Sequence, residues 1–380
     1  MSDPSGSREV RREGRILHRE MVQLGVLALV SVVAFLVTRA VAAGSREIAL
    51  RDAEAWYRVG RRQLASGDLE GAVDSLRRAA ARHRGEKTYG LALAEALTAL
   101  HDYDSASQVL LNLRETEPDD PGIDLELARL AVRRQDFPGA LKYYRQTLSA
   151  DWPAEQIAAR RDVRFELIAV LLERHQNERA LSELMALDAN LPDRASTLAK
   201  AATLFARAGD ERRALAEFQR ALRLAPDDRD VLAGAGRSAF ELGEYETARA
   251  YLRRAPPGAA PETLETADLV VTGDPLAKRI GSAERGRRLA DALAYATTRL
   301  SACADRTAGA ASTGVAQALA REAQALQTHV KNRMTDQDTI EAGVELVSRM
   351  VHEATDVCGP ATTRDRALVL IARRHGADAR

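Results

Sequence analysis

The sequence predicts an all-α protein in three parts: an N-terminal transmembrane helix, an α-solenoid of about six helical hairpins and a C-terminal helical bundle. Three observations lead to this prediction. Aromatic residues are scarce at 4%, while Ala and Leu are plentiful, which favours helices. A residue pattern recurs about every 34 positions through the middle of the chain. An uncharged apolar run lies near the N-terminus.

The composition is that of a folded chain. Of the 380 residues, 46% are hydrophobic and 29% are charged, which separates this chain from disordered proteins. The 55 Lys and Arg residues balance 55 Asp and Glu residues, whereas a dedicated nucleic-acid-binding protein normally has a basic excess. The two cysteines exclude a disulfide-rich scaffold and a cysteine-only zinc site. The length allows two or three domains, or one extended array.

The apolar run covers residues 21–38 and contains no charged residue. At 1.5 Å per residue it would extend roughly 27 Å, close to the hydrocarbon thickness of a bilayer. We interpret 21–43 as an uncleaved transmembrane signal anchor between an N-terminal tail at 1–20 and a linker at 44–52. Two alternatives stay open: a cleaved signal peptide, since Ala40-Val41-Ala42 matches an A-x-A cleavage pattern, and a soluble helix.

The basic residues that flank this run predict its orientation. Five arginines precede it, and Arg39, Arg46 and Arg51 follow it closely. Because basic residues concentrate on the cytoplasmic side, we expect the tail to be cytoplasmic. The chain would then be a single-pass protein of the bacterial inner membrane, with its body in the periplasm.

The middle of the chain, residues 53–262, is built from an internal repeat. The segments 65–79, 206–221 and 240–255 share Gly, then an acidic residue, then Ala five places after the Gly. A large apolar residue follows four places later, and Ala follows three places after that. The same spacing can be followed through six units, with six inserted residues at 155–160. The units are 53–86, 87–120, 121–154, 161–194, 195–228 and 229–262.

This pattern resembles the tetratricopeptide repeat (TPR), a helix–turn–helix unit of about 34 residues, in the form found in membrane-anchored bacterial proteins. Trp56, Gly60 and Ala72 occupy signature places of the first unit, and small residues there let the two helices of a unit approach closely. In the fourth unit, His175-Gln176-Asn177 replaces the usual Gly–acidic turn. Since one hairpin cannot bury its apolar face alone, the units should stack into a superhelix.

The resemblance implies that a protein or peptide partner binds in a concave groove, which the first helix of each unit lines. The residues expected there are Tyr57, Arg61, Leu91, Glu95, Leu125, Arg129, Arg133, Phe165 and Arg237. Family members that clamp chaperone C-termini use Asn and Lys or Arg at these places, and the lack of Asn here excludes that clamp.

Three interpretations of this groove stay open. In the first, the groove is only a solvated face of the protein. In the second, the partner binds a different surface. In the third interpretation the groove arginines recognise an acidic or C-terminal segment, because guanidinium groups bind carboxylates bidentately. The arginines concerned are Arg61, Arg129, Arg133 and Arg237.

Residues 263–380 do not continue the repeat. The sequence predicts a capping helix at 262–272, followed by the bundle. Helices are expected at 282–306, 313–333, 337–358 and 363–374 from apolar residues spaced three and four apart.

The two cysteines lie near the ends of the first and third bundle helices. In an up-down-up bundle these helices are parallel, so Cys303 and Cys358 would meet at one end. In a periplasmic body a Cys303–Cys358 disulfide is then expected. The alternative is a pair of small buried residues that never bond.

No motif for catalysis, metal binding or a cofactor occurs, so we expect neither an enzyme nor a bound cofactor. We expect a membrane-anchored scaffold or adaptor that mediates protein–protein interactions in the bacterial cell envelope. The alternative is a chaperone-like assembly factor that binds segments of secreted or envelope proteins. Exposed apolar groove residues would favour this alternative, and the candidates are Tyr57, Leu91, Leu125, Phe165 and Phe240.

Overall fold

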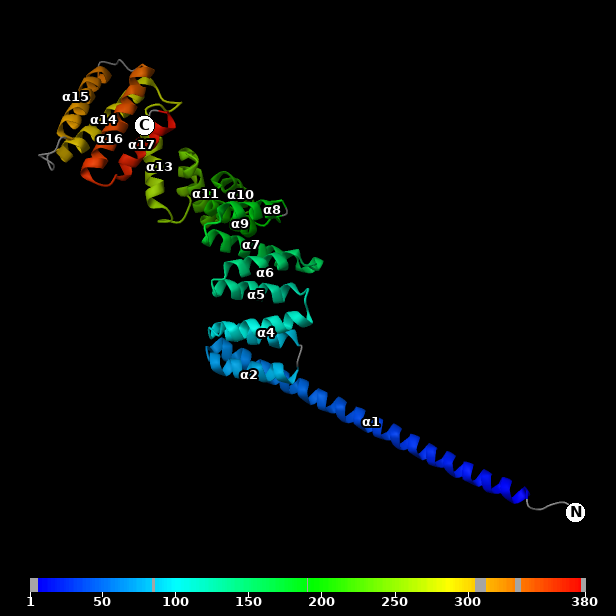
Figure 1. Ribbon diagram of the computed structural model, residues 1–380. Coiled ribbons are helices and arrows are strands. Elements are labelled where there is room, and N and C mark those ends of the chain that lie inside the picture. Colours follow the sequence, from blue (N-terminus) through cyan, green and yellow to red (C-terminus); the bar gives the residue numbers. More distant parts are fainter. Residues whose placement is uncertain (1–5, 84–85, 190, 305–311, 332–335, 377–380) are drawn as a thin grey trace. The chain divides into compact units, whose positions relative to one another are not determined.

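The computed structural model is helical in every element that it describes (Figure 1). It describes residues 6–83, 86–189, 191–304, 312–331 and 336–376, and within these ranges it leaves out the side chains of 6–26, 40–46, 303–304, 312–313, 331 and 358. The chain divides into two compact units, Met1–Leu167 and Ile168–Arg380, and the division falls within α7 (Ile157–Glu173).

The first unit stacks helical hairpins. After α1 (Gly6–Ser66), its helices are α2 (Leu69–Arg82), α3 (Lys87–Ala99), α4 (Tyr103–Thr116), α5 (Pro121–Arg133), α6 (Phe137–Ser149) and the short 3₁₀ turn η1 (Ala154–Gln156). The helices α1 and α2, α3 and α4, and α5 and α6 pack as pairs, and α2 contacts α3 just as α4 contacts α5. The inserted residues 155–160 complete η1 and form the first turn of α7.

The second unit continues the hairpins and ends in a bundle. Its elements after α7 are α8 (Asn177–Asp188), α9 (Ala195–Ala208), α10 (Glu211–Leu224), α11 (Arg229–Glu241), α12 (Tyr245–Leu252), α13 (Pro261–Gly273), α14 (Ser282–Ala304), α15 (Ser312–Lys331), α16 (Gln337–Cys358) and α17 (Thr363–Arg374). The helix α13 packs against both α12 and α17, so one hydrophobic core joins the last hairpin to the bundle.

Six buried alanines mark the contact between the two helices of a hairpin. They have no solvent exposure, and they occupy the same place in each of the six successive units: Ala72, Ala106, Ala140, Ala180, Ala214 and Ala248. The facing helix also needs a small residue. A Cβ atom added to Gly60 would lie 2.6 Å from Leu76 Cγ, and one added to Gly236 would lie 2.5 Å from Leu252 Cγ. The backbones therefore approach more closely than larger side chains allow.

The turn inside each hairpin has a residue in the left-handed backbone region, at the same place of every unit. These residues are Gly67, His101, Gln135, His175, Gly209 and Gly243, with φ between 55° and 90°. The fourth unit therefore makes the same turn as the others, although His175 stands where the family pattern has Gly. In four units an Asp follows this residue and caps the second helix, as Asp68 does by accepting from the Gly71 N–H at 3.0 Å.

The expected transmembrane anchor at 21–43 is wrong. In the part of the chain that the structure describes, no helix has the length and apolar character needed to cross a membrane. Within the expected anchor, the uncharged residues with described side chains are 27–38. Their large apolar side chains are between 51% and 67% exposed. The single-pass inner-membrane location with a periplasmic body is wrong for the same reason.

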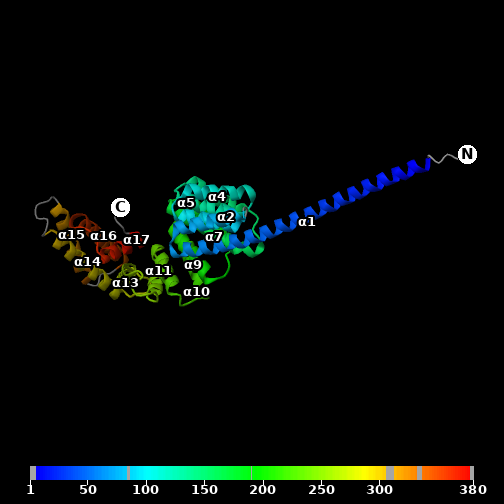
Figure 2. The ribbon, with the colours of Figure 1, turned by 90° about the horizontal axis from the view of Figure 1, so that it is seen from below.

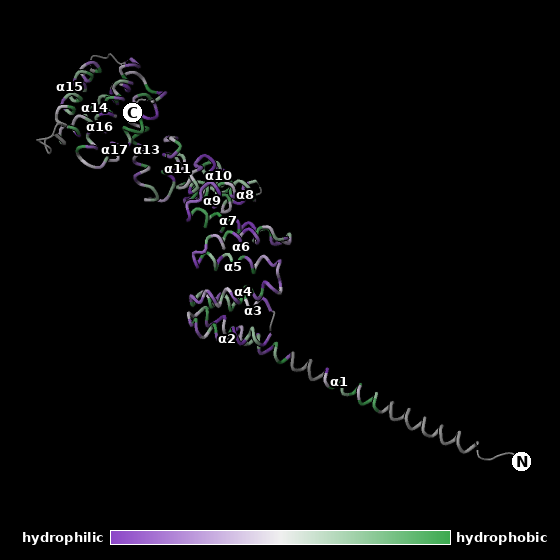
Figure 3. The backbone as a smooth tube through the Cα atoms, in the orientation of Figure 1, coloured by the Kyte–Doolittle hydropathy of each residue, from purple (hydrophilic) through white to green (hydrophobic). Residues whose placement is uncertain are grey.

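The segments on either side of the expected anchor form one helix with it. The helix α1 continues through the expected linker at 44–52 and packs against α2 with its C-terminal part. Figure 2 shows its N-terminal part projecting from the other helices of the first unit, and Figure 3 shows the hydrophobic stretch on it. Residues 1–5 of the expected tail lie outside the described residues, as do the side chains of 6–26.

The left-handed turn residues generate a stability prediction. Because a side chain in this backbone region costs roughly 1–2 kcal/mol, Gln135→Gly and His175→Gly should each raise the free energy of unfolding by about 0.5–1 kcal/mol. Both side chains are exposed. Urea denaturation of the full chain, followed by circular dichroism, measures the change. Gly209→Ala is the matched control and should lower the midpoint. A lower midpoint for both glycine variants would contradict the left-handed turns.

Candidate functional site

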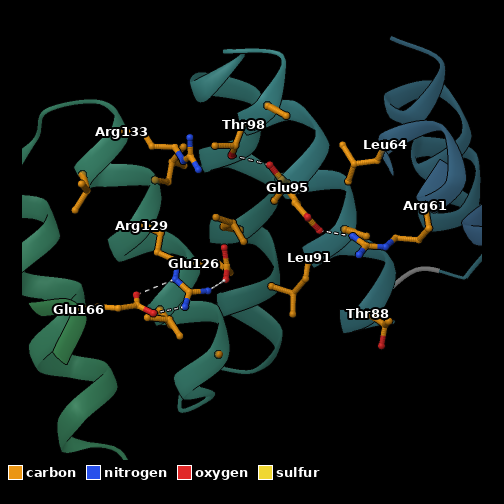
Figure 4. Close-up of a pocket in the computed structure, with 18 of the residues that line it drawn as sticks. Arg61, Leu64, Thr88, Leu91, Glu95, Thr98, Glu126, Arg129, Arg133 and Glu166 are labelled. Atoms are coloured by element: carbon orange, nitrogen blue, oxygen red, sulfur yellow. Dashed lines mark hydrogen bonds and ion pairs between the residues drawn. The ribbon is translucent and has the colours of Figure 1, made fainter. Parts of the chain in front are cut away.

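The first unit has a groove that runs over its first helices. It has a volume of about 1070 Å³ and is lined mainly by residues of α1, α3, α5 and α7, with Leu110 of α4 and Tyr144 of α6. Figure 4 shows Thr98 and Arg133 at one end of it and Thr88 at the other. Thr88 lies in the first turn of α3, while Thr98 and Arg133 lie in the last turns of α3 and α5. The groove therefore extends along the whole length of these helices.

Seven of the nine residues expected in the groove line it together. They are Tyr57, Arg61, Leu91, Glu95, Leu125, Arg129 and Arg133. Phe165 is instead buried, with 2% of its surface exposed. Arg237 is exposed on α11 of the second unit, so it does not belong to this groove. That these residues bind a partner stays a prediction.

The groove arginines have carboxylate partners within the chain. Arg61 forms an ion pair with Glu95, which occupies the same place in the next repeat. Arg129 donates two hydrogen bonds to Glu166, at 3.0 and 2.6 Å, and a third to Glu126 at 2.6 Å. The hydrogen bonds to Glu166 raise the pKa of the Arg129 guanidinium above its ordinary value. These guanidinium groups are therefore already neutralised.

Arg133 is different from the other two. It is exposed at the end of α5, and no described residue forms an ion pair with it. The charged residues that line the groove are Arg61, Arg129, Arg133, Glu95, Glu126 and Glu166, so the lining has three charges of each sign. The groove as a whole is neutral, with one unpaired cation at one end.

Apolar side chains form the rest of the lining. Tyr57, Leu91 and Leu125 are half-buried, so each keeps a part of its surface in contact with solvent. The ring of Tyr57 lies 5.2 Å from that of Tyr89, which holds it at the edge of the groove. Other lining residues were missed by sequence reasoning: Leu64, Thr88, Thr98, Glu126 and Glu166. The repeat offered a signal for Glu166, because it follows Glu126 by one repeat plus the insertion.

A second hollow continues the groove beyond the N-terminal ends of α3 and α5. It encloses about 600 Å³ and shares Leu91 and Gly122 with the groove. We call it the acidic end, because four carboxylates and one Lys line it: Glu117, Asp119, Asp120, Asp151 and Lys87. Lys87 pairs with Asp120 and with Glu117, and its hydrogen bond to Asp120 raises the pKa of the Lys87 ammonium group.

The described residues offer no group of three His, Cys, Asp or Glu side chains that could hold a metal ion. The expected absence of catalytic, metal and cofactor sites stays an expectation.

The helices that carry the cysteines run parallel. Near their N-terminal ends, Leu289 of α14 packs against Gly343 of α16. Near their C-terminal ends, Arg299 of α14 donates to the carbonyl of Pro360, just after α16, at 3.3 Å. Cys303 and Cys358 therefore belong to the last turns of two helices that end at the same end of the bundle. Their side chains lie outside the described residues, so the disulfide stays a prediction.

Oxidation of the purified full chain tests this disulfide. Because the two helix ends coincide, mild oxidation should link Cys303 to Cys358 within one chain. Peptide mapping by mass spectrometry after thiol alkylation would detect the link, with Cys358→Ser as the control that cannot form it. Two alkylated cysteines after oxidation, or a dimer linked between chains, would contradict the prediction.

A family model supports the repeats. The family model described as tetratricopeptide repeat matches residues 63–130 and 205–264. Similar solved structures include PilF of Pseudomonas aeruginosa, with 17% identity, 56% of this chain and 94% of that chain covered, and a TM-score of 0.41. PilW, described as a type IV pilus biogenesis factor, has 17% identity, covers 56% of this chain and 97% of that chain, and has a TM-score of 0.41.

Another similar structure is the C-terminal part of a TPR repeat-containing protein from Cytophaga hutchinsonii. It has 11% identity, covers 80% of this chain and 100% of that chain, and has a TM-score of 0.44. No curated protein matches the chain.

Proposed function

We propose that this chain, which contains tetratricopeptide repeats, is a scaffold that binds a segment of a partner protein in the groove of its first unit. Repeats of this kind stack into arrays whose concave surfaces bind protein or peptide partners. One observation carries the proposal: half-buried apolar side chains line a long groove whose own charges are largely neutralised within the chain.

The apolar lining supplies the driving force for binding. Tyr57, Leu91 and Leu125 belong to three successive first helices, α1, α3 and α5, and each is partly exposed. A segment that covers them removes their remaining apolar surface from water, which stabilises a complex by roughly 25 cal/mol per Å². Because the three residues recur at the same place in the repeat, they form a continuous strip.

The ion pairs decide the kind of segment that fits. A partner carboxylate that binds Arg61 competes with Glu95, and one that binds Arg129 competes with both Glu126 and Glu166. Each ion pair that the partner breaks leaves a groove carboxylate without its cation. The free energy gained from the new ion pair is therefore offset by the loss of the existing one. The centre of the groove therefore favours an uncharged segment over the acidic one that the arginines by themselves suggest.

The chaperone-like alternative has less support. It depends on a broad exposed apolar surface, yet Phe165 is buried and Phe240 packs against the core of the C-terminal bundle. The apolar surface that remains is the narrow strip of Tyr57, Leu91 and Leu125, which suits one segment.

Peptide selection tests the groove. We expect the full chain to select 12-residue peptides with an uncharged apolar centre from a phage-displayed library. In fluorescence anisotropy, the double variant Leu91→Ser/Leu125→Ser should weaken binding of the selected peptides at least tenfold, because it removes apolar contacts worth roughly 1.5 kcal/mol or more. The double variant Arg61→Gln/Glu95→Gln should change the affinity by less than about threefold, since it removes a pair that is neutral overall.

The matched control replaces two exposed leucines outside the groove, Leu111→Ser/Leu224→Ser. It should bind like the parent chain, and circular dichroism should show all variants folded. Unchanged binding by the folded Leu91→Ser/Leu125→Ser chain would refute the groove as the binding site.

A further inference from the structure

The two ends of the groove have opposite unpaired charges. At the C-terminal end of α5, Arg133 is exposed, and in the described residues it has no ion-pair partner. At the other end, Asp119 and Asp151 are exposed and likewise have no ion-pair partner in the part of the chain that is described. The charges between the ends are paired with one another, apart from a single surplus carboxylate beside Arg129.

Helix capping explains only a part of the acidic end. Asp120 caps α5 by accepting hydrogen bonds from the Gly122 and Ile123 N–H groups, at 2.9 and 3.0 Å. It also pairs with Lys87. Asp119 and Asp151 do not cap a helix with a hydrogen bond in the described structure. Their negative charge is therefore available to a ligand, and one Lys among four carboxylates leaves this hollow with a surplus of three negative charges.

Trp152 adds a surface that suits a cation. It lines the same hollow as Asp151 and Asp119. Its indole Nε1–H donates to the Thr147 carbonyl at 2.8 Å, which holds the half-buried ring in place. An aromatic ring beside carboxylates favours the side chain of a Lys or Arg, which gains both ion pairing and cation–π attraction.

The distance between the ends corresponds to a short peptide. From Gly122, at the acidic end, to Arg133 the helix α5 rises by about 16 Å at 1.5 Å per residue. An extended chain advances about 3.3 Å per residue, so about five residues span this length. Those five residues would run along α3 and α5, across the apolar strip at Leu91 and Leu125 and past the paired charges, where uncharged side chains fit.

We propose that the groove binds its partner in one direction: a segment with an acidic group on Arg133 and a basic side chain at Asp119, Asp151 and Trp152, about five uncharged residues apart. The inference rests on the proposed function and adds the charge pattern and the direction of the partner. The opposite direction brings the acidic group to the carboxylates and the basic group to Arg133, so both ends repel.

Two synthetic peptides test the direction. Both have the same five uncharged residues, taken from a library-selected peptide, and blocked ends. One has Glu before them and Lys after them, and the second has Lys before them and Glu after them with the core in the same order, so that a given placement of the core presents the opposite charge order along the groove. Whichever sense of the chain the groove accepts, the full chain should prefer one peptide about tenfold, and the preference should fall as the salt concentration rises.

Charge-reversal variants test which charged group of the peptide binds at each end of the groove. Arg133→Glu should weaken the preferred peptide about three- to fivefold, and replacing the peptide Glu by Lys should restore the affinity. Asp119→Lys/Asp151→Lys should behave in the same way towards the peptide Lys. The matched controls are Arg145→Glu and Asp162→Lys, exposed residues of α6 and α7 that do not line the groove. They should leave the preference unchanged.

The failures of the two proposals are distinguishable. If the uncharged core binds but both charge orders bind equally, or if the swapped peptides restore nothing, the direction is refuted and the groove stands. If neither the core nor any selected peptide binds to the groove, both proposals fall.

Discussion

The close contact between the two helices of each hairpin is the constraint on which the rest of the structure depends. Six alanines with no solvent exposure recur at one place of the repeat, from Ala72 to Ala248. A larger side chain at these contacts would push the helices apart, because interiors of this density have no room for an added methylene group. Glycines on the facing helix, such as Gly60 against Leu76, meet the same requirement. With the hairpins held at one spacing, their stacking brings equivalent residues of successive units next to each other.

This stacking decides the electrostatics of the groove. Arg61 and Glu95 are one full repeat apart in sequence, and the stacking converts that separation into an ion pair between neighbouring helices. Arg129 is held by Glu166 across the insertion in the same manner. The arginines that suggest a basic recognition surface in the sequence therefore form ion pairs within the protein itself. What remains for a partner is a groove that an apolar strip crosses, with Arg133 at one end of the groove and unpaired carboxylates at the other.

Sequence reasoning succeeded where local pattern and repeat period act together. The first helices α3, α5, α9 and α11 begin at Lys87, Pro121, Ala195 and Arg229, where the period places the starts of their units. Seven of nine expected groove residues lie together for the same reason. Phe165 is buried and does not line the groove, because the burial of a ring depends on which neighbours surround it. The inserted residues also lengthen α7 at its start, so this helix differs from the other first helices. The expected membrane anchor is wrong because, among the described residues, no helix has the length and apolar character needed to cross a membrane, and the residues of the expected anchor belong to α1, which continues into the first hairpin.

The sequence by itself determined the helical class, the repeat period and the place of each turn, because these follow from side-chain size, capping residues and spacing along one stretch of chain. The turn at His175 shows the strength of that constraint, since a residue other than Gly adopts the left-handed conformation to keep the hairpin. Only the tertiary structure decided which charges are free. Pairing depends on side chains from different repeats that meet across the groove, and no local pattern states that Arg61 and Arg129 have carboxylate partners while Arg133 has none in the described residues.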